Sequence, residues 1–351
     1  MTHLWVRAEQ RPNEERVGLT PLGAKALLDK GIRVTVEDST TRAIPIDGYR
    51  LAGVEIAPEN SWPRAPADAI VFGLKELPDD DTALVHRHIM FGHAFKGQPA
   101  GQKLLRRFKA GGGTLFDLEY LVNSDGRRVA AFGYWAGYAG AAVALKCWSA
   151  QKRGALCGPV GAYESSLHLQ QDLQTELLRI GTQRPTALVI GALGRVGTGA
   201  ADLCRTMGVP VSKWDMNETA HGGPFPEVLA HDIFLNCILA RPGTPVFVPA
   251  SASHAQRRLT VIGDIACDPD SDFSPIKVYD RTTSWEKPAL RVHHSPPLDV
   301  TAIDNLPSML PGESSEDYAA QLLPSLLTLE TLETGVWGRA RDMFNEHITR
   351  L

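Results

Sequence analysis

Two side chains that can carry protons near neutral pH follow apolar runs of the sequence. Lys75 lies at the end of the predicted strand AIVFGLKE and is followed by Glu76, and His93 lies in FGHAFKGQ, after another apolar run. Ligands of α/β domains bind at strand ends, and a lysine in a low-dielectric site has a lowered pKa that suits acid–base work. Histidine is the usual proton carrier near pH 7. From position alone, a solvated lysine and a core or turn histidine remain the commoner alternatives.

Several arginines could hold anionic groups of a substrate. Arg16, in NEERVGLTP, could bind a carboxylate through both arms of its guanidinium, or form a surface ion pair with Glu14 or Glu15. Arg127 and Arg128 follow a predicted turn at residues 125–126 and could hold a carboxylate or a phosphate. A solvated basic turn is the alternative for this pair.

A glycine-rich segment, TALVIGALGRVGTGAAD, has the order strand, loop and helix that dinucleotide binding requires. Gly191, Gly194 and Gly197 allow a tight turn, close approach of backbone to a pyrophosphate, and helix–strand packing. Asp215 ends the next predicted strand, where a carboxylate binds ribose hydroxyls and repels a 2′-phosphate, which favours NAD over NADP. A tight turn without a ligand is the alternative, and Arg195 could instead meet a phosphate.

Other classes of function find little support in the composition. The net charge of -4, with both signs interspersed over 351 residues, gives no reason to expect nucleic-acid binding. The pairs His86/His88 and His293/His294 lack a third metal ligand, and neither HExxH nor GxSxG occurs. The N-terminus lacks a signal-peptide core, and residues 136–145 are too short to span a membrane. Five cysteines without a CxxC pair predict free thiols and a cytoplasmic location.

The elements that must position these residues form two series. In the first third, predicted strands (HLWVRAE, IRVTVED, AIVFGLKE, IMFGHAF, TLFDLEYL) alternate with helical patterns (PLGAKALLDKG, GQKLLRRFKAGGG). A helix over 133–150 has a face of small residues that would let it lie close to another backbone. The second series has strands in TALVIGA, VPVSKWD, DIFLNCIL and RLTVIGDIA, and a helix in AADLCRTMG.

The remaining chain is predicted to be an irregular stretch over 268–297 and final helices over about 314–329 and 335–349. Strand–helix alternation predicts parallel βαβ units, hence an α/β fold with two Rossmann-like domains.

Taken together, several segments resemble one known family in their order along the chain. They include ERVGLTP, GLKELP, FGHAFKGQ, GGTLFDLEYLVNSDGRRVAAFGYWAGYAGAA, VIGALGRVGTGA, KWD, GGPF and AIDNLPSMLP. The chain resembles the NAD-dependent, lysine-forming saccharopine dehydrogenases of the alanine dehydrogenase/transhydrogenase superfamily. The likeness extends over nearly the whole chain, and the long GGTLFDLEYL block and DNLPSMLP are its most specific parts.

The resemblance implies two domains with an active-site cleft between them. A discontinuous substrate domain would comprise 1–131 plus 322–351, and an NAD-binding domain 132–321. Lys75 and His93 would be the acid–base pair. The substrate site would comprise Arg16, Lys75, Glu76, Lys96, Glu119, Arg128 and Phe132. NAD would contact Arg127, Gly191, Gly194, Arg195, Gly197, Asp215, Thr219, Leu239, Ile265, Ile303, Asp304, Asn305 and Leu306.

The implied reaction is the reversible oxidation of saccharopine, through an imine, to lysine and 2-oxoglutarate. Saccharopine carries three carboxylates, so arginines near the site are expected, and no metal is needed. A related opine-type synthase or amino-acid dehydrogenase with another amine and keto acid is the alternative enzyme. A catalytically silent NAD-binding protein would have no physical need for both Lys75 and His93. The expected partners are small molecules, without nucleic acid or membrane, and the sequence leaves monomer and homodimer open.

Overall fold

A computed structural model describes all of residues 1–351 and divides them into two compact units. Unit 1 comprises Met1–Ala131 and Pro311–Leu351, and unit 2 comprises Phe132–Leu310. The second boundary lies before residue 311, whereas the sequence places it after 321. The reason is that α9 (Pro311–Leu326) is one continuous helix, which packs on α1 (Pro21–Asp29) of unit 1.

Unit 1 is built on a sheet of six parallel strands. Its other elements in chain order are β1 (His3–Val6), β2 (Arg33–Glu37), α2 (Ile46–Leu51), β3 (Glu55–Ala57), η1 (Trp62–Arg64), β4 (Ile70–Phe72), β5 (Arg87–Met90), α3 (Pro99–Gly111), β6 (Thr114–Asp117) and α10 (Gly335–Thr349). The strand order is β3-β2-β1-β4-β5-β6. The chain therefore reverses its direction of winding between β1 and β4, which is the switch point where α/β sheets bind ligands.

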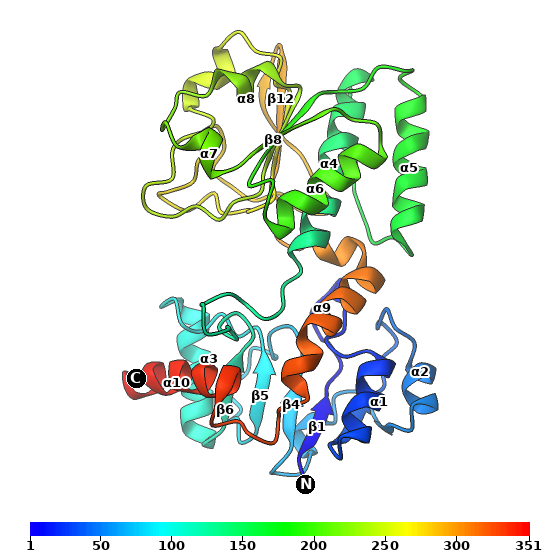
Figure 1. Cartoon of the computed structure of the whole chain (residues 1–351), viewed down its shortest axis with the longest axis vertical. Helices are drawn as coiled ribbons and strands as arrows, with labels where there is room; N and C mark the ends of the chain where they lie inside the picture. The colour runs from blue at the N-terminus through cyan, green and yellow to red at the C-terminus, as the bar shows by residue number, and fades with distance from the viewer. The chain divides into compact units, whose positions relative to one another are not determined.

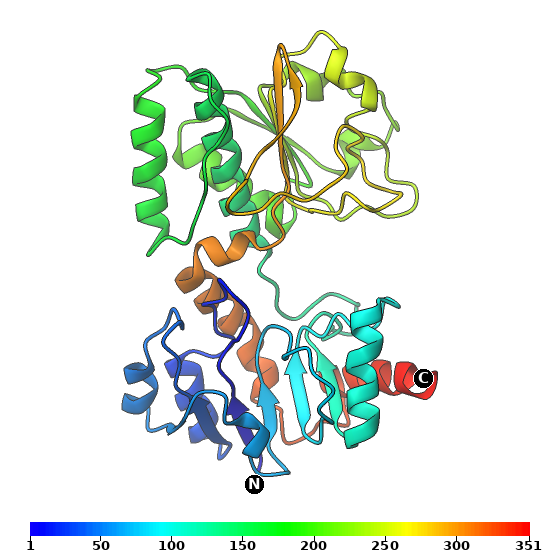
Figure 2. The ribbon, with the colours of Figure 1, turned by 180° about the vertical axis from the view of Figure 1, so that it is seen from behind.

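Local signals explain where the elements of unit 1 begin and end. The Thr20 hydroxyl accepts a hydrogen bond from the Gly23 N–H at 3.1 Å and caps α1, with Pro21 at its first position. Helix α3 ends at Gly112, whose φ of 74° is costly for other residues. In Figures 1 and 2 the C-terminal helix α10 lies beside α3 and β6, although they are far apart in the sequence.

Unit 2 contains the second sheet, also of six strands. Its elements are α4 (Gly133–Lys152), α5 (Ser166–Leu178), β7 (Ala187–Ile190), α6 (Arg195–Thr206), β8 (Val211–Trp214), α7 (Met216–Thr219), α8 (Pro226–Ala230), β9 (Ile233–Asn236), η2 (Ala250–His254), β10 (Val261–Asp264), β11 (Leu290–His294), β12 (Pro297–Thr301) and η3 (Leu306–Met309). The order is β11-β12-β10-β9-β7-β8, with the switch point between β7 and β9.

The sheet has an edge formed by β11 and β12, where the sequence predicts an irregular stretch over 268–297. The two strands pair antiparallel, while all other pairs in this sheet are parallel. The prediction was wrong for Leu290–His294 because this strand is only half-buried and lacks a continuous apolar run. By contrast, every residue of β7, β9 and β10 is buried, as expected for strands covered on both faces.

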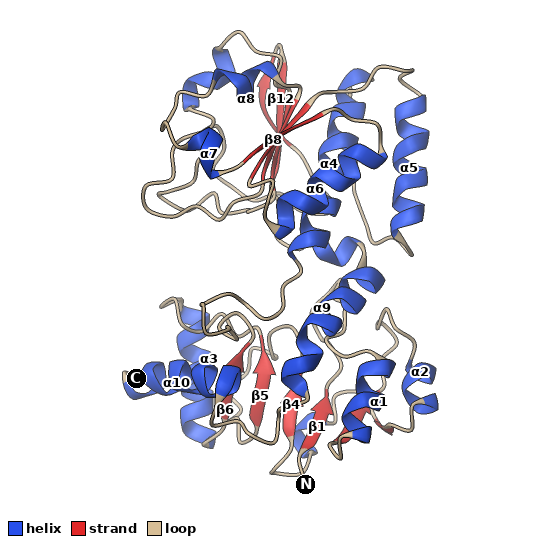
Figure 3. Cartoon of the chain, in the orientation of Figure 1, coloured by secondary structure: helices blue, strands red, loops and turns tan.

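Helix α4 packs backbone to backbone on α6, as its small-residue face predicts. A Cβ added to Gly137 would lie 1.8 Å from the carbonyl oxygen of Val196, and one added to Gly199 would lie 1.9 Å from that of Tyr134. Glycine is thus the only residue that fits at either position. Figure 3 shows the helices of unit 2, in blue, on the two sides of its strands, in red. No helix of the chain is both long and apolar enough to cross a membrane.

Candidate active site

The predicted acid–base residues follow neighbouring strands at one edge of the unit 1 sheet. Lys75 lies three residues beyond β4, and His93 lies three residues beyond β5. Because β4 and β5 are parallel neighbours, both segments leave the sheet at its carboxyl edge. Lys75 also lies at the switch point between β1 and β4. The topology therefore gathers these residues where an α/β sheet binds its ligand.

Lys75 has a lowered pKa. Burial is the largest cause, and the positive charge of Arg16 adds to it, while the Glu14 carboxylate acts in the opposite direction. A lysine in such surroundings loses its proton more readily than a solvated one and can accept a proton from a substrate. Lys75 is half-buried rather than fully exposed.

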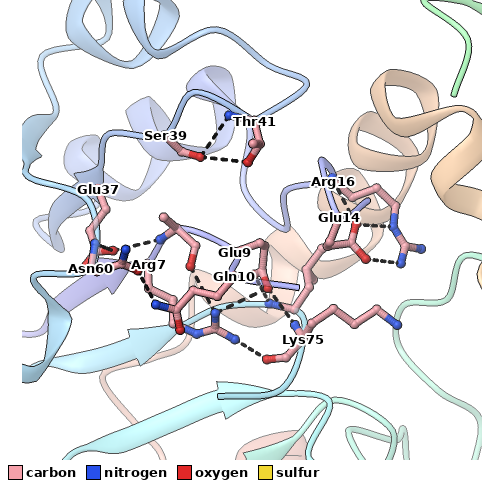
Figure 4. A network of polar contacts seen from close by, with 12 residues as sticks. Arg7, Glu9, Gln10, Glu14, Arg16, Glu37, Ser39, Thr41, Asn60 and Lys75 are labelled. Carbon is pink, nitrogen blue, oxygen red and sulfur yellow. Dashed lines mark hydrogen bonds and ion pairs between the residues drawn. The ribbon is translucent and has the colours of Figure 1, made fainter. Parts of the chain in front are cut away.

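Arg16 pairs with Glu14, but the pair is buried rather than on the surface. Arg16 Nε donates to Glu14 Oε1 at 2.8 Å and Nη2 donates to Oε2 at 2.7 Å, and the Arg16 side chain is only 3% exposed. Burial raises the pKa of Glu14, but the hydrogen bonds and charge of Arg16 outweigh it, so the pKa is lowered. Figure 4 shows this pair close to the Lys75 side chain.

Glu119 gathers three basic side chains at the same edge. It lies two residues beyond β6 and accepts a hydrogen bond from Lys96 Nζ at 2.9 Å and another from Arg128 Nη2 at 3.3 Å. His93 Nδ1 is 3.6 Å from Glu119 Oε2. The contact with His93 and the bond from Lys96 lower the pKa of Glu119 to about 2, and the same carboxylate raises the pKa of His93.

Glu76 connects the two predicted proton carriers electrostatically. Its carboxylate raises the pKa of both Lys75 and His93, although it is not the largest cause for either. Arg11 Nη1 lies 3.7 Å from Glu76 Oε1 in an exposed ion pair. The charge of one carboxylate therefore acts on the pKa of both carriers.

Two features of this edge were missed in the sequence. His93 has a φ of 47°, in the left-handed region, and residues held there occur often at functional sites. Asp117, the last residue of β6, is fully buried, and burial raises its pKa to about 6. Its position at a strand end was the only available signal.

Three further predicted site residues lie close together in the sequence: Arg127 is a predicted NAD contact, and Arg128 and Phe132 are predicted substrate residues. The Arg127 side chain is 86% exposed, and its Nε lies 3.6 Å from Asp125, as expected of a solvated turn. Arg128 differs from Arg127 because its guanidinium pairs with Glu119 and is less exposed. Phe132 belongs to unit 2, where it caps the N-terminus of α4.

The predicted dinucleotide loop follows β7 at the switch point of unit 2. Gly191 has a φ of 86°, and a Cβ on Gly197 would lie 2.1 Å from the Gly191 carbonyl oxygen. A Cβ on Gly194 would meet only that oxygen, at 3.4 Å. Packing therefore requires glycine at 191 and 197, whereas 194 has room at the start of α6. This is the position where a dinucleotide loop keeps glycine so that a pyrophosphate can approach.

Asp215 lies at the end of β8, next to the loop. Its Oδ2 accepts the Leu193 N–H at 3.0 Å, and its Oδ1 accepts the Met216 N–H at 2.9 Å. It caps α7, and the Thr219 hydroxyl donates to its carbonyl oxygen at 3.0 Å. A carboxylate held at the tip of the strand after the glycine loop fits recognition of ribose hydroxyls.

The other predicted cofactor contacts follow β9, β10 and β12. Leu239 is 61% exposed and Asp304 is exposed, while the side chains of Ile265, Ile303 and Leu306 belong to the unit 2 core. Asn305 is half-buried. The three core residues could meet a dinucleotide mainly through backbone atoms.

The chain can be compared with known proteins on this basis. The model of the alanine dehydrogenase/PNT N-terminal domain matches residues 5–139. The fold is similar to that of an L-alanine dehydrogenase, with a TM-score of 0.70, 17% identity, and coverage of 98% of this chain and 99% of that one. It is also similar to a transhydrogenase from Sinorhizobium meliloti, with a TM-score of 0.63, 18% identity, and coverage of 94% and 95%. These likenesses establish the two-domain α/β fold.

Curated relatives are much closer in sequence. A saccharopine dehydrogenase [NAD(+), L-lysine-forming] from Candida albicans is 44% identical over 99% of this chain and 97% of its own length. One of the same name from Schizosaccharomyces pombe is 42% identical over 99% of both chains. Another, from Emericella nidulans, is 44% identical over 99% of this chain and 98% of its own. The chain therefore belongs to the family of NAD-dependent, L-lysine-forming saccharopine dehydrogenases.

Proposed function

We propose that this chain catalyses the reversible, NAD-dependent oxidation of saccharopine to lysine and 2-oxoglutarate. The observation that carries the proposal is the pair of proton carriers at one sheet edge, within a chain of this family. The pKa of Lys75 is lowered by burial and the pKa of His93 is raised by Glu119, so the two values are shifted toward each other. Groups tuned in this way can exchange protons with a substrate near neutral pH.

Lys75 is the better candidate for the base that takes the proton of the secondary amine. Burial and the nearby Arg16 guanidinium favour its neutral form, which has a lone pair to accept a proton. His93, held by Glu119, is the candidate for the proton transfers as water adds to the imine and the carbinolamine collapses. Bound NAD supplies the hydride acceptor for the oxidation.

The basic side chains around these residues would orient the substrate. Arg16, Lys96 and Arg128 supply three cationic groups, each hydrogen-bonded to a carboxylate of the chain. The Arg128 guanidinium, held by Glu119 through one nitrogen, is preorganised to present its other donors to a substrate carboxylate. Saccharopine has three carboxylates, so this number of cations is chemically appropriate.

Unit 2 would bind NAD, and unit 1 would carry the substrate and catalytic residues. The open position at Gly194, the N-terminus of the twelve-residue helix α6 and the carboxylate of Asp215 support this division. The helix N-terminus favours the pyrophosphate charge, and Asp215 favours NAD over NADP. A cytoplasmic location stays a prediction, and both a monomer and a homodimer remain open.

The test follows NADH absorbance with purified protein, 2-oxoglutarate and one amine at a time: lysine, ornithine, alanine or ammonia. Oxidation of NADH that requires lysine supports the proposal. Oxidation with another amine would keep the mechanism and change the substrate. Absence of oxidation with every amine, with NAD still bound, would favour a silent NAD-binding protein.

Two variants make the assay specific for Lys75. Lys75→Met removes the amine and should abolish turnover while NADH binding is retained. Lys25→Met is the matched control, because Lys25 is an exposed residue of α1 that pairs with Asp29 one turn away. Full activity in Lys75→Met would contradict the assigned role.

A further inference from the structure

A buried Arg7–Glu9 pair at the end of β1 holds the backbone of Lys75 from both sides. The Glu9 carboxylate accepts the N–H of Leu74 at 2.5 Å and that of Lys75 at 3.0 Å. Arg7 Nη2 donates to the carbonyl oxygen of Lys75, and Arg7 Nη1 lies 3.4 Å from Glu9 Oε2. The side chains of Arg7 and Glu9 are 1% and 8% exposed. Figure 4 shows the pair at the Lys75 backbone, with the Lys75 side chain extending away from it.

Gly73 makes this arrangement possible. A Cβ at Gly73 would lie 2.4 Å from Arg7 Nε and 2.5 Å from Arg7 Cζ, which is inside contact distance. The guanidinium therefore lies directly against the chain at Gly73, just beyond β4. Arg7 and Glu9 follow β1, and Gly73 and Lys75 follow β4. The two segments lie side by side because β1 and β4 are parallel neighbours, so the contact depends on that pairing.

The segment carrying Lys75 is not part of the sheet. Strand β4 ends at Phe72, so Leu74 and Lys75 have no ladder partners from β1. Glu9 and Arg7 satisfy three of their backbone groups, and the fourth, the Leu74 carbonyl, accepts the Phe91 N–H at 3.0 Å. Phe91 lies on the segment that leads to His93. Every backbone polar group at Lys75 is thus fixed by a side chain or by the neighbouring strand end.

We propose that Arg7 and Glu9 are positioning residues, which fix the point from which the Lys75 side chain reaches its substrate. This rests on the proposed function, in which Lys75 is the base. The proposed function gives neither Arg7 nor Glu9 a contact with the substrate. Both residues therefore act on the reaction through the Lys75 backbone. A displacement of about 1 Å in a catalytic group can lower a rate by about a hundredfold, so such fixation has kinetic value.

Glu9→Gln tests the contact with the N–H groups of Leu74 and Lys75. Each oxygen of the Glu9 carboxylate accepts one of them, whereas the amide of glutamine has a single oxygen to accept with. Glu9→Asp keeps the charge and should recover part of the lost rate. Arg7→Lys tests the donor side and provides a second variant if Glu9→Gln folds poorly. Asp232→Asn is the matched control: Asp232 also accepts a backbone N–H, that of Thr186 at 2.8 Å, and pairs with Arg258, but in unit 2.

The kinetic readout is kcat and KM over a range of pH. We expect kcat for saccharopine to fall about tenfold or more in Glu9→Gln and Arg7→Lys. The limb of the pH profile that reports Lys75 should move, while KM for NADH stays within about twofold. Asp232→Asn should lower thermal stability comparably but leave kcat and the pH profile within about twofold.

A second readout does not depend on turnover. Trace acetylation of Lys75 with acetic anhydride, measured by mass spectrometry across pH, gives the titration of its amine, with exposed Lys25 as internal reference. We expect the Lys75 midpoint in Glu9→Gln to move toward that of Lys25. Wild-type protein that fails to oxidise saccharopine would refute the proposed function alone. Unchanged kcat, pH profile and acetylation in both variants would show that the pair is only structural.

Discussion

The carboxylate of Glu119 lies 3.6 Å from Nδ1 of His93. That carboxylate has a pKa of about 2 and therefore stays ionised at any pH at which the protein would work. Its negative charge stabilises the imidazolium form of His93, and the pKa of His93 is raised. The proton affinity of the proposed second catalytic group is thus set by a residue from the neighbouring strand end.

Glu119→Gln should lower the pKa of His93, because the variant removes the charge that stabilises the imidazolium. The limb of the kcat/KM profile that reports His93 should move to lower pH by about one unit. An NMR titration of His93 provides an independent measurement. Asp125→Asn, which removes a carboxylate near Arg127 instead, is the control and should leave that limb in place. An unchanged His93 titration in Glu119→Gln would contradict the assignment.

Arg16→Gln should raise the pKa of Lys75, because the guanidinium lowers that pKa and Glu14, which raises it, would remain. The rise in kcat/KM with pH should then occur about one unit higher, and KM for saccharopine should increase. The variant leaves Glu14 buried without its cation, which also costs stability. In the double variant Glu14→Gln/Arg16→Gln both charges are removed, so the pH profile should return toward that of the wild type. A double variant whose pH profile is displaced as far as that of Arg16→Gln alone would show that the Glu14 carboxylate does not act on Lys75.

Gly194→Ala and Gly197→Ala should separate cofactor binding from folding. A Cβ at 194 has room within the protein, so this variant should keep wild-type stability while its affinity for NADH falls about tenfold or more. A Cβ at 197 would lie 2.1 Å from the Gly191 carbonyl oxygen, so that variant should lose about 1–3 kcal/mol of stability. Gly158→Ala, with open space around the added carbon, is the control for both. Equal NADH affinity in Gly194→Ala and the wild type would falsify the proposed pyrophosphate site.

The buried histidine of β5 should make unit 1 sensitive to acid. His88 packs edge-on against Trp62 and Phe108, and burial lowers its pKa well below 6.5. The unfolded chain therefore binds a proton that the folded chain rejects, so stability is lost as pH falls below about 6.5.

His88→Phe should remove that part of the acid sensitivity, as measured by denaturant midpoints at pH 7 and pH 5. The variant also eliminates the buried Nε2 atom, which has no hydrogen-bond partner. The same change at exposed His168 is the control and should leave the pH dependence as it is. Identical losses at pH 5 in His88→Phe and wild type would show that other groups are responsible.

The sequence by itself determined the α/β fold, the order of most elements and the positions of the two strand-end proton carriers. Apolar runs such as AIVFGLKE identify buried strands, and parallel strands expose their carboxyl ends at one edge, so Lys75 and His93 were expected to lie there. The spacing of the glycines at 191–197, between an apolar strand and a helix, likewise predicted a dinucleotide loop. These signals are local, and each can be recognised within one strand, turn and helix.

Only the tertiary structure decided which side chains meet. Glu14 is two residues from Arg16, yet whether that pair is solvated or buried depends on the fold around it. Lys75 is 66 residues from Glu9 and 68 from Arg7. They meet because β4 is paired with β1 and not with β3, the strand that precedes β4 in the sequence. The half-buried strand β11 was missed for a similar reason, since it pairs with β12 and packs on core residues that lie far from it in the sequence. Contacts between distant segments follow from strand order and packing, which no single window of sequence contains.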